Sequence, residues 1–224
     1  KNMEGLTGTN PSVGSILVKN DEIISLASTG NNGTPHSEFT LLNKIDKKIT
    51  KGSTLYVTLE PCSHYGKTPP CTNIIVDKKI SRLVFGTYDI DQRSSKRAKQ
   101  ILKSKKIKVK RINVPKINEF YKPYIFQRKY KQPYVSGKIA CSKDFFIKGT
   151  KSKYISNIYT QSFSHHLRYK NQAILVTYKT INEDNPLLDC RLSGLNKFSP
   201  IKVIIDKNLK VKKNVKIFKL KNTK

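Results

Sequence analysis

Four side chains in the first half of the sequence could form a catalytic metal site. His36 precedes Glu38 by two positions, and Cys62, which directly follows Pro61, is followed later by Cys71. One imidazole and two thiolates are a typical ligand set for zinc, and three protein ligands leave a fourth position open for water. We therefore predict a zinc site held by His36, Cys62 and Cys71, with Glu38 beside it as the catalytic group.

The chemistry that suits this set of residues is hydrolytic deamination. Zinc lowers the pKa of water from 15.7 to about 7 and so supplies hydroxide at neutral pH. A carboxylate two residues after the histidine reaches that water without binding the metal, and it can pass protons to the leaving amine. The pattern H-x-E followed by P-C-x-x-C is the signature of zinc deaminases. One spacing departs from it, since eight residues separate Cys62 from Cys71.

The eight residues between the two cysteines form a loop that suits the binding of a phosphate. They include His64, Lys67 and Thr68 together with a glycine. The lysine offers a compact positive charge on a flexible stem. The alternative is a closed structural zinc site with His64 as its fourth ligand, but that interpretation leaves Glu38 without a role.

The chain is strongly basic, with 44 Lys and Arg residues against 15 Asp and Glu residues and a formal net charge of +29. Clustered basic residues would indicate nucleic acid as a partner, because they release counterions from phosphates. Here the lysines are scattered along the chain, so lysine at most solvated positions is the favoured interpretation and nucleic acid is not the expected partner. A positive field also attracts small phosphorylated substrates.

No segment of the sequence indicates export or a membrane. No apolar run approaches the roughly 18 residues needed to cross a bilayer, and no charged and then apolar start resembles a secretory signal. We therefore expect a cytoplasmic protein with no membrane partner, and we expect it to form a homo-oligomer. The chain begins with Lys1 rather than methionine, which suggests a processed or partial sequence.

The first half of the chain alternates short apolar strands with helical patterns, which favours an α/β sandwich. A helix is expected from Pro35, with Phe39, Leu42 and Ile45 at helical spacing. The run 54–59 is β-branched and aromatic, as is typical of a buried central strand. The remaining expected elements are strands over 15–18 and 22–27, a helix over 73–79, a strand over 82–86, a helix over 94–103 and a strand over 107–112.

A second α/β unit is expected after the polar, basic and proline-terminated stretch 128–133. We predict strands over 134–140, 173–177 and 201–205, and a helix over 156–169. The interpretation is therefore two domains, residues 1–128 and residues 133–224. We expect the N-terminal helix of the first domain, and the second domain as a whole, to be incomplete.

The residues of the first half resemble the bifunctional riboflavin-biosynthesis deaminase/reductase family. The stretch 55–71 looks like the zinc loop of that family almost without change, 10–14 resembles its N-terminal substrate motif and 36–38 its metal motif. The resemblance implies a cytidine-deaminase-like three-layer sandwich that acts on a small phosphorylated pyrimidine, a phosphoribosylated diaminopyrimidinone. By this resemblance the substrate would be held by Asn10, His64, Lys67 and Thr68.

The second half resembles the reductase domain of the same family, which is dihydrofolate-reductase-like and uses NADPH. The stretch 138–144 matches its opening strand and turn, although Phe145 stands where the family usually has glycine. Arg168 and Arg191, taken without the family, are typical of plain surface charges. The resemblance implies nucleotide contacts by Ala140, Tyr154, Thr180 and Asp184, and substrate contacts by Ser152, Arg168, Leu188 and Arg191. Because the domain is expected to be partial, we do not expect this chain to reduce its own deamination product.

Two other functions remain open from the sequence. A nucleic-acid base deaminase is favoured by the charge of +29, and disfavoured by the phosphate-type loop and the second domain. A zinc-stabilised nucleic-acid-binding protein without catalysis belongs to another class. Binding to random single-stranded DNA with a steep salt dependence would favour either of them, because phosphate neutralisation gives such a slope.

Overall fold

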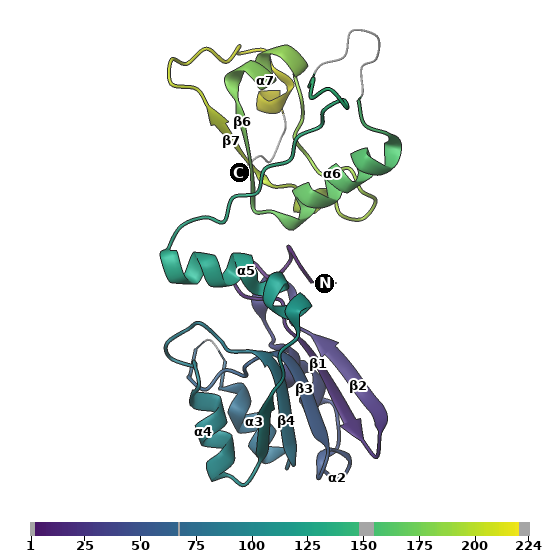
Figure 1. The fold of residues 1–224 in the computed structure, drawn as a ribbon, viewed down its shortest axis with the longest axis vertical. Coiled ribbons are helices and arrows are strands. Elements are labelled where there is room, and N and C mark those ends of the chain that lie inside the picture. The colour runs from purple at the N-terminus through teal and green to yellow at the C-terminus, as the bar shows by residue number, and fades with distance from the viewer. Residues whose placement is uncertain (1–2, 67, 148–154, 220–224) are drawn as a thin grey trace. The chain divides into compact units, whose positions relative to one another are not determined.

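The computed structural model divides the chain into two compact units, Lys1–Val135 and Ser136–Lys224 (Figure 1). It describes residues 3–66, 68–147 and 155–219. Each unit combines helices with a sheet around a core of its own. No helix within the described ranges is long and apolar enough to span a membrane. The limits of the two functional domains, expected at residues 128 and 133, remain a prediction.

A five-stranded sheet forms the centre of the first unit, with the strand order β2-β1-β3-β4-β5 (Figure 1). Its strands are β1 (Gly14–Lys19), β2 (Glu22–Ser28), β3 (Thr54–Leu59), β4 (Arg82–Thr87) and β5 (Lys108–Arg111). β1 runs antiparallel to both β2 and β3, whereas β3, β4 and β5 are parallel. Each strand expected in this half of the sequence is present, and β3 lies at the centre of the sheet.

Alternation along β3 separates the two faces of the sheet. Leu55 and Val57 are buried on one face, while Tyr56 and Thr58 point to the other. The first face is covered by α1 (Ser37–Asn43), α3 (Cys71–Asp77) and α4 (Arg97–Ser104), and the short α2 (Lys47–Thr50) follows α1. The core on this face consists of apolar side chains from the strands and these helices, namely Leu17, Leu41, Leu42, Leu55, Val57, Ile75, Ile80, Leu83, Phe85, Leu102 and Ile107.

The opposite face is covered by a sixteen-residue helix, α5 (Pro115–Tyr130), which is not among the elements expected from the sequence. α5 approaches β4 closely at Gly86, where a Cβ atom would lie 2.8 Å from Ile117 Cδ1. The helix escaped notice because its aromatic residues are spread around its circumference and Pro123 lies inside it, so no clear apolar stripe appears in the sequence. Two layers of helices around one sheet make this unit the three-layer sandwich expected from the resemblance.

Hydrogen bonds of Tyr121 connect α5 to the sheet. Its side chain is 1% exposed, its hydroxyl lies 2.7 Å from Thr58 Oγ1, and it donates to the Ser12 carbonyl at 3.0 Å. Removal of a buried hydroxyl leaves its partners unsatisfied.

We therefore expect Tyr121→Phe to lower the free energy of unfolding by about 1–3 kcal/mol, as measured by urea denaturation. Tyr130→Phe is the matched control, because Tyr130 belongs to the same helix and is 52% exposed. Equal stability of the two variants would show that these hydrogen bonds do not hold α5 in place.

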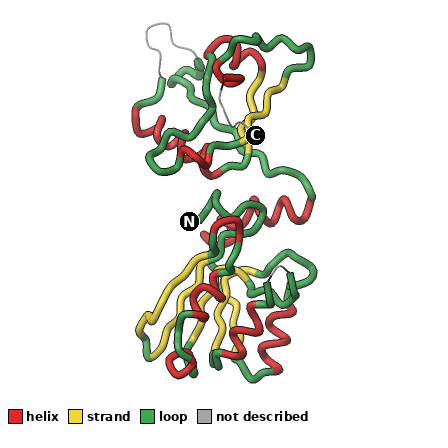
Figure 2. Tube along the Cα trace, turned by 180° about the vertical axis from the view of Figure 1, so that it is seen from behind, coloured by secondary structure: helices red, strands yellow, loops and turns green. Residues whose placement is uncertain are grey.

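The second unit contains a two-stranded parallel sheet and a smaller core (Figure 2). Its elements are α6 (Ile158–Lys170), β6 (Ala173–Thr177), α7 (Tyr178–Asp184) and β7 (Ile201–Ile205), with short 3-10 helices at Asn196–Phe198 and Lys216–Lys219. α6 begins after Asn157, whose side chain accepts a hydrogen bond from the Thr160 N–H. The core is formed by Ile181, Leu188, Val215 and Ile217.

The strand predicted over 134–140 was wrong, because this stretch is irregular and residues 134–139 are exposed. A strand requires a hydrogen-bonded neighbour, and within the described part of this unit only β6 and β7 pair with each other. The strands expected over 173–177 and 201–205 are both present. The helix expected over 156–169 is α6, whereas α7 was not expected.

Candidate active site

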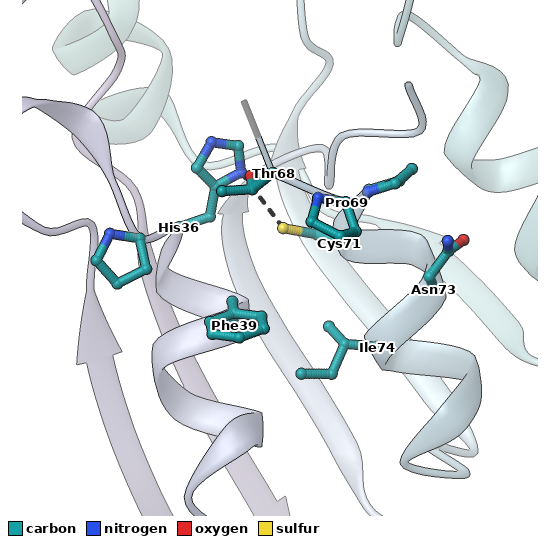
Figure 3. Close-up of a pocket in the computed structure, with 9 residues that line it drawn as sticks. His36, Phe39, Thr68, Pro69, Cys71, Asn73 and Ile74 are labelled. Atoms are coloured by element: carbon teal, nitrogen blue, oxygen red, sulfur yellow. Dashed lines mark hydrogen bonds between the residues drawn. The ribbon is translucent and has the colours of Figure 1, made fainter. Parts of the chain in front are cut away.

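The three predicted zinc ligands lie together, although they come from separate parts of the chain. His36 is the residue immediately before α1, Cys62 follows the end of β3 and Cys71 is the first residue of α3. His36 Nδ1 lies 3.5 Å from Cys62 Sγ and 3.4 Å from Cys71 Sγ. The ligand atoms of the three residues are all within 4.8 Å of one another. Figure 3 shows the contact between Cys71 and His36.

Electrostatics at the two sulfur atoms favour a cation at this point. The interaction between the two neighbouring thiols lowers the pKa of Cys62 and raises that of Cys71, so the pair readily holds one negative charge. The Cys71 backbone N–H also donates to Cys62 Sγ at 3.2 Å. A divalent cation deprotonates coordinating thiols outright. One imidazole and two such sulfur atoms are soft and borderline donors, and this site fits zinc.

Glu38 lies beside these ligands on the first turn of α1. Its side chain is 3% exposed, and Ser37 Oγ donates a hydrogen bond to Glu38 Oε2 at 2.9 Å. Burial is the main cause that raises the pKa of the Glu38 carboxyl, and the charge of Cys62 adds to it. A carboxyl group with a raised pKa holds a proton more readily, which suits a residue that both takes up and releases protons.

A pocket opens next to His36 and Cys71 (Figure 3). Its walls are largely apolar and include Phe39 and Ile74, with Asn73 as a polar group. Such a mixture of flat apolar surface and a few polar groups suits a planar ring with polar substituents. The complete lining is Pro35, His36, Phe39, Thr68, Pro69, Pro70, Cys71, Asn73 and Ile74.

The substrate residues implied by the resemblance are placed as follows in this unit. Thr68 lines the pocket, and Lys67 lies outside the described residues. The Asn10 side chain packs against Gly33, three residues before His36, in a position that a Cβ atom on Gly33 would overlap. His64 Nδ1 lies 2.7 Å from Ser94 Oγ. His64 therefore bonds a serine, and among the described residues the ligand cluster consists of His36, Cys62 and Cys71 without it.

In the second unit, three of the implied substrate residues meet around one loop. Arg168 Nη1 donates to the Asp189 carbonyl at 3.0 Å, and Arg191 Nε lies 3.5 Å from Asp189 Oδ1. Leu188, which is 5% exposed, is part of the core beneath them. Arg168 is thus held by the Asp189 carbonyl, whereas the side chain of Arg191 is 61% exposed, as is typical of a surface charge.

The implied nucleotide residues of the second unit are more widely spread along the chain. Thr180 and Asp184 both belong to α7, with Asp184 as its last residue. Ala140 lies in the irregular stretch before residue 148. Ser152, a substrate residue, and Tyr154 lie outside the described residues.

Each of the two units contains residues that match a known family of protein domains. Residues 1–87 match the cytidine and deoxycytidylate deaminase zinc-binding region, and residues 133–224 match the RibD C-terminal domain. The riboflavin biosynthesis protein RibD of Aquifex aeolicus is 34% identical over 97% of this chain and 61% of its own length. The RibD protein of Bacillus amyloliquefaciens is 35% identical over 93% of this chain and 56% of its own length.

The chain belongs to the RibD family. A solved structure from Thermotoga maritima has a TM-score of 0.86 and 32% sequence identity to this chain. The match covers 96% of this chain and 62% of the Thermotoga chain. That protein is described as a diaminohydroxyphosphoribosylaminopyrimidine deaminase/5-amino-6-(5-phosphoribosylamino)uracil reductase. Acinetobacter baumannii RibD has a TM-score of 0.84 and 28% identity over the same shares. This member of the RibD family thus spans about three fifths of the length of these relatives.

Two residues near the site of this RibD-family chain were not identified from the sequence. Phe39 was expected to be an apolar position of a helix, but it is 42% exposed and lines the pocket. Ser94, which bonds His64, lies in no motif and comes thirty positions later in the chain. The helical pattern alone does not show that Phe39 is exposed at the pocket. The contact between Ser94 and His64 joins residues thirty positions apart, so it leaves no local signal in the sequence.

Proposed function

We propose that the first unit is a zinc-dependent hydrolase that deaminates a phosphoribosylated diaminopyrimidinone in riboflavin biosynthesis. The observation that carries this proposal is the buried Glu38 carboxyl beside three ligand atoms that lie within 4.8 Å of one another. A closed structural zinc site would give that carboxyl no role. The Thermotoga maritima relative, at 32% identity, is described as a deaminase and reductase of such compounds.

Each group of residues at the site has its own role in the proposed reaction. Zinc, when bound by His36, Cys62 and Cys71, supplies the Lewis acidity that makes hydroxide available from water near neutral pH. A water oxygen forms a bond with the ring carbon, and the bond from that carbon to the amine breaks. Glu38 takes up one proton of the water and delivers it to the ring nitrogen. It then passes the second proton from the new hydroxyl group to the amine, which leaves as ammonia. The apolar walls formed by Phe39 and Ile74 exclude bulk water from one side of the ring.

The phosphate of the substrate is assigned to the loop between the two cysteines, and Asn10 is assigned to the substrate as well. The loop supplies His64, Lys67 and Thr68, and Thr68 lines the pocket next to Cys71. The positive field of the whole chain, which has a net charge of +29, favours the approach of an anionic substrate.

We expect Lys67→Ala to raise KM for the phosphorylated substrate about tenfold or more, because a charge-assisted contact with phosphate contributes about 1.5–3 kcal/mol. KM for the dephosphorylated analogue should change little. The measurement is ammonia release with both compounds, and Lys51→Ala, at an exposed lysine of a turn, is the control. An equal rise in KM for both compounds would count against a role of Lys67 in phosphate binding.

For the second unit we propose a part in the reduction that follows, in which NADPH transfers a hydride to the sugar carbon and the ribose opens to a ribityl chain. That this chain alone does not reduce its deamination product stays a prediction. Nucleotide contacts are assigned to Ala140, Tyr154, Thr180 and Asp184, and substrate contacts to Ser152, Arg168, Leu188 and Arg191. The support is the match to the RibD C-terminal domain and the arrangement of Arg168 and Arg191 around Asp189. A homo-oligomeric state and a cytoplasmic location stay predictions.

Ammonia release from the phosphorylated diaminopyrimidinone by the purified, zinc-loaded chain tests the function of the first unit. Turnover of this compound and not of random single-stranded DNA supports the proposal. Deamination of DNA alone would favour a nucleic-acid base deaminase instead.

A further inference from the structure

Ser94 is a buried serine that contacts the loop between the two zinc ligands. It lies in the turn between β4 and α4, and its side chain is 0% exposed. Its Oγ accepts a hydrogen bond from the Ser63 backbone N–H at 3.2 Å and lies 2.7 Å from His64 Nδ1. One hydroxyl group is therefore joined to two successive residues directly after Cys62.

The hydrogen bonds of Ser94 determine which nitrogen of His64 carries the proton. A buried hydroxyl donates its proton to an acceptor, because an unsatisfied donor costs about 1–3 kcal/mol. Ser63 N–H is itself a donor, so it cannot serve as that acceptor. Within the described part of the chain, His64 Nδ1 is the acceptor that lies within hydrogen-bond distance of Ser94 Oγ. With Ser94 as the donor to Nδ1, the N–H of the ring lies on Nε2.

The other ring nitrogen of His64 points along the loop. Nε2 lies 3.9 Å from the position that a Cβ atom on Gly66 would occupy. The Gly66 N–H bonds the Thr68 carbonyl at 3.3 Å, and Thr68 lines the pocket. Nε2 therefore lies near Gly66, within the loop to which the substrate phosphate is assigned.

The turn that carries Ser94 is itself fixed to the end of β3. The Glu60 carboxylate, which is 2% exposed, accepts a hydrogen bond from the Lys96 backbone N–H at 3.0 Å. The Ser94 N–H donates to the Asp91 carbonyl at 2.9 Å, and Ser63 Oγ donates to the Arg93 carbonyl at 3.4 Å. A hydroxyl held in this way loses little further freedom when it bonds His64.

We propose that Ser94 is a positioning residue, which holds the His64 ring so that its Nε2–H is presented to a phosphate oxygen of the substrate. This inference rests on the proposed function, because it concerns how that substrate is recognised. Among the described residues, the Ser94 hydroxyl bonds Ser63 and His64 and none of the predicted metal ligands. Its role is to fix the orientation and the tautomer of the histidine that binds the phosphate.

The first test separates substrate binding from turnover. Ser94→Ala should raise KM for the phosphorylated substrate about 3–10-fold, in line with the loss of one hydrogen bond, while kcat and zinc content stay within about twofold. Ser95→Ala is the matched control at the adjacent, half-buried serine. In a His64→Ala background, Ser94→Ala should raise KM no further. A rise of the same size in that background, or with the dephosphorylated analogue, would overturn the inference.

The second test observes the ring directly. The chain contains four histidines, so ¹⁵N spectra of imidazole-labelled protein resolve His64, with His64→Ala to assign it. We expect a proton on Nε2 and an acceptor at Nδ1 in the zinc-loaded protein, and a mixture of tautomers in Ser94→Ala. A proton on Nδ1 in a protein that deaminates the substrate would reject the role of Ser94 alone. The expected tautomer in a protein that releases no ammonia would instead reject the proposed function.

Discussion

Glu38→Gln should lower kcat for ammonia release by about 10²–10⁴-fold while the protein keeps its zinc. General acid–base catalysis contributes a factor of this size, and an amide cannot take up the proton of water and deliver it to the amine. The substitution preserves the volume of a side chain that is 3% exposed, and the amide oxygen can still accept the hydrogen bond from Ser37. The fold and the ligand geometry should therefore be retained.

The measurement for Glu38→Gln is kcat together with zinc content, both compared with Glu119→Gln. Glu119 is exposed on α5, so the control makes the same chemical change away from the site. Turnover of Glu38→Gln within a few-fold of the parent would show that another group moves the protons.

Cys71→Ser should remove the metal and with it the activity. Cys71 Sγ lies 3.4 Å from His36 Nδ1 and is one of three ligand atoms within 4.8 Å. A serine hydroxyl stays protonated near neutral pH and is a far weaker zinc ligand than a thiolate, and two remaining ligands do not complete a catalytic site. We expect zinc content close to zero and no measurable ammonia release.

Metal analysis and ammonia release on Cys71→Ser should be run beside Cys141→Ser. Cys141 is a half-buried cysteine of the second unit, and it is not among the ligands. Full zinc occupancy in Cys71→Ser would contradict the assignment of the ligands, whatever the activity of that variant.

The parts of the fold that the sequence predicted are those in which local pattern and burial agree. β3 is present over 54–59 because β-branched and aromatic residues suit a strand, and one of its faces is buried through Leu55 and Val57, although Tyr56 on the other face is 38% exposed. The sequence singled out His36, Cys62 and Cys71, which lie together in the structure, because a metal site demands particular residue types at particular spacings. Their convergence depends on the sheet, which brings the start of α1, the end of β3 and the start of α3 to one place.

The parts that the sequence did not predict depend on contacts between distant residues. α5 has no clear apolar stripe, and it is held by Tyr121 on Thr58 and Ser12, far away in the sequence. The strand expected over 134–140 has apolar residues but no neighbour with which to pair among the described residues. The contact of Ser94 with His64 joins a turn to a loop, and neither segment has a pattern that indicates the other.

Ammonia release from the phosphorylated diaminopyrimidinone, before and after removal of zinc by a chelator, is the decisive measurement of the proposed activity. We expect turnover by the zinc-loaded chain, loss of turnover after chelation, and recovery when zinc is returned. The cluster of His36, Cys62 and Cys71 around one point, with Glu38 buried beside it, is the basis of that prediction. A folded, zinc-loaded chain that releases no ammonia from this compound, or that releases it equally well without zinc, would contradict the account.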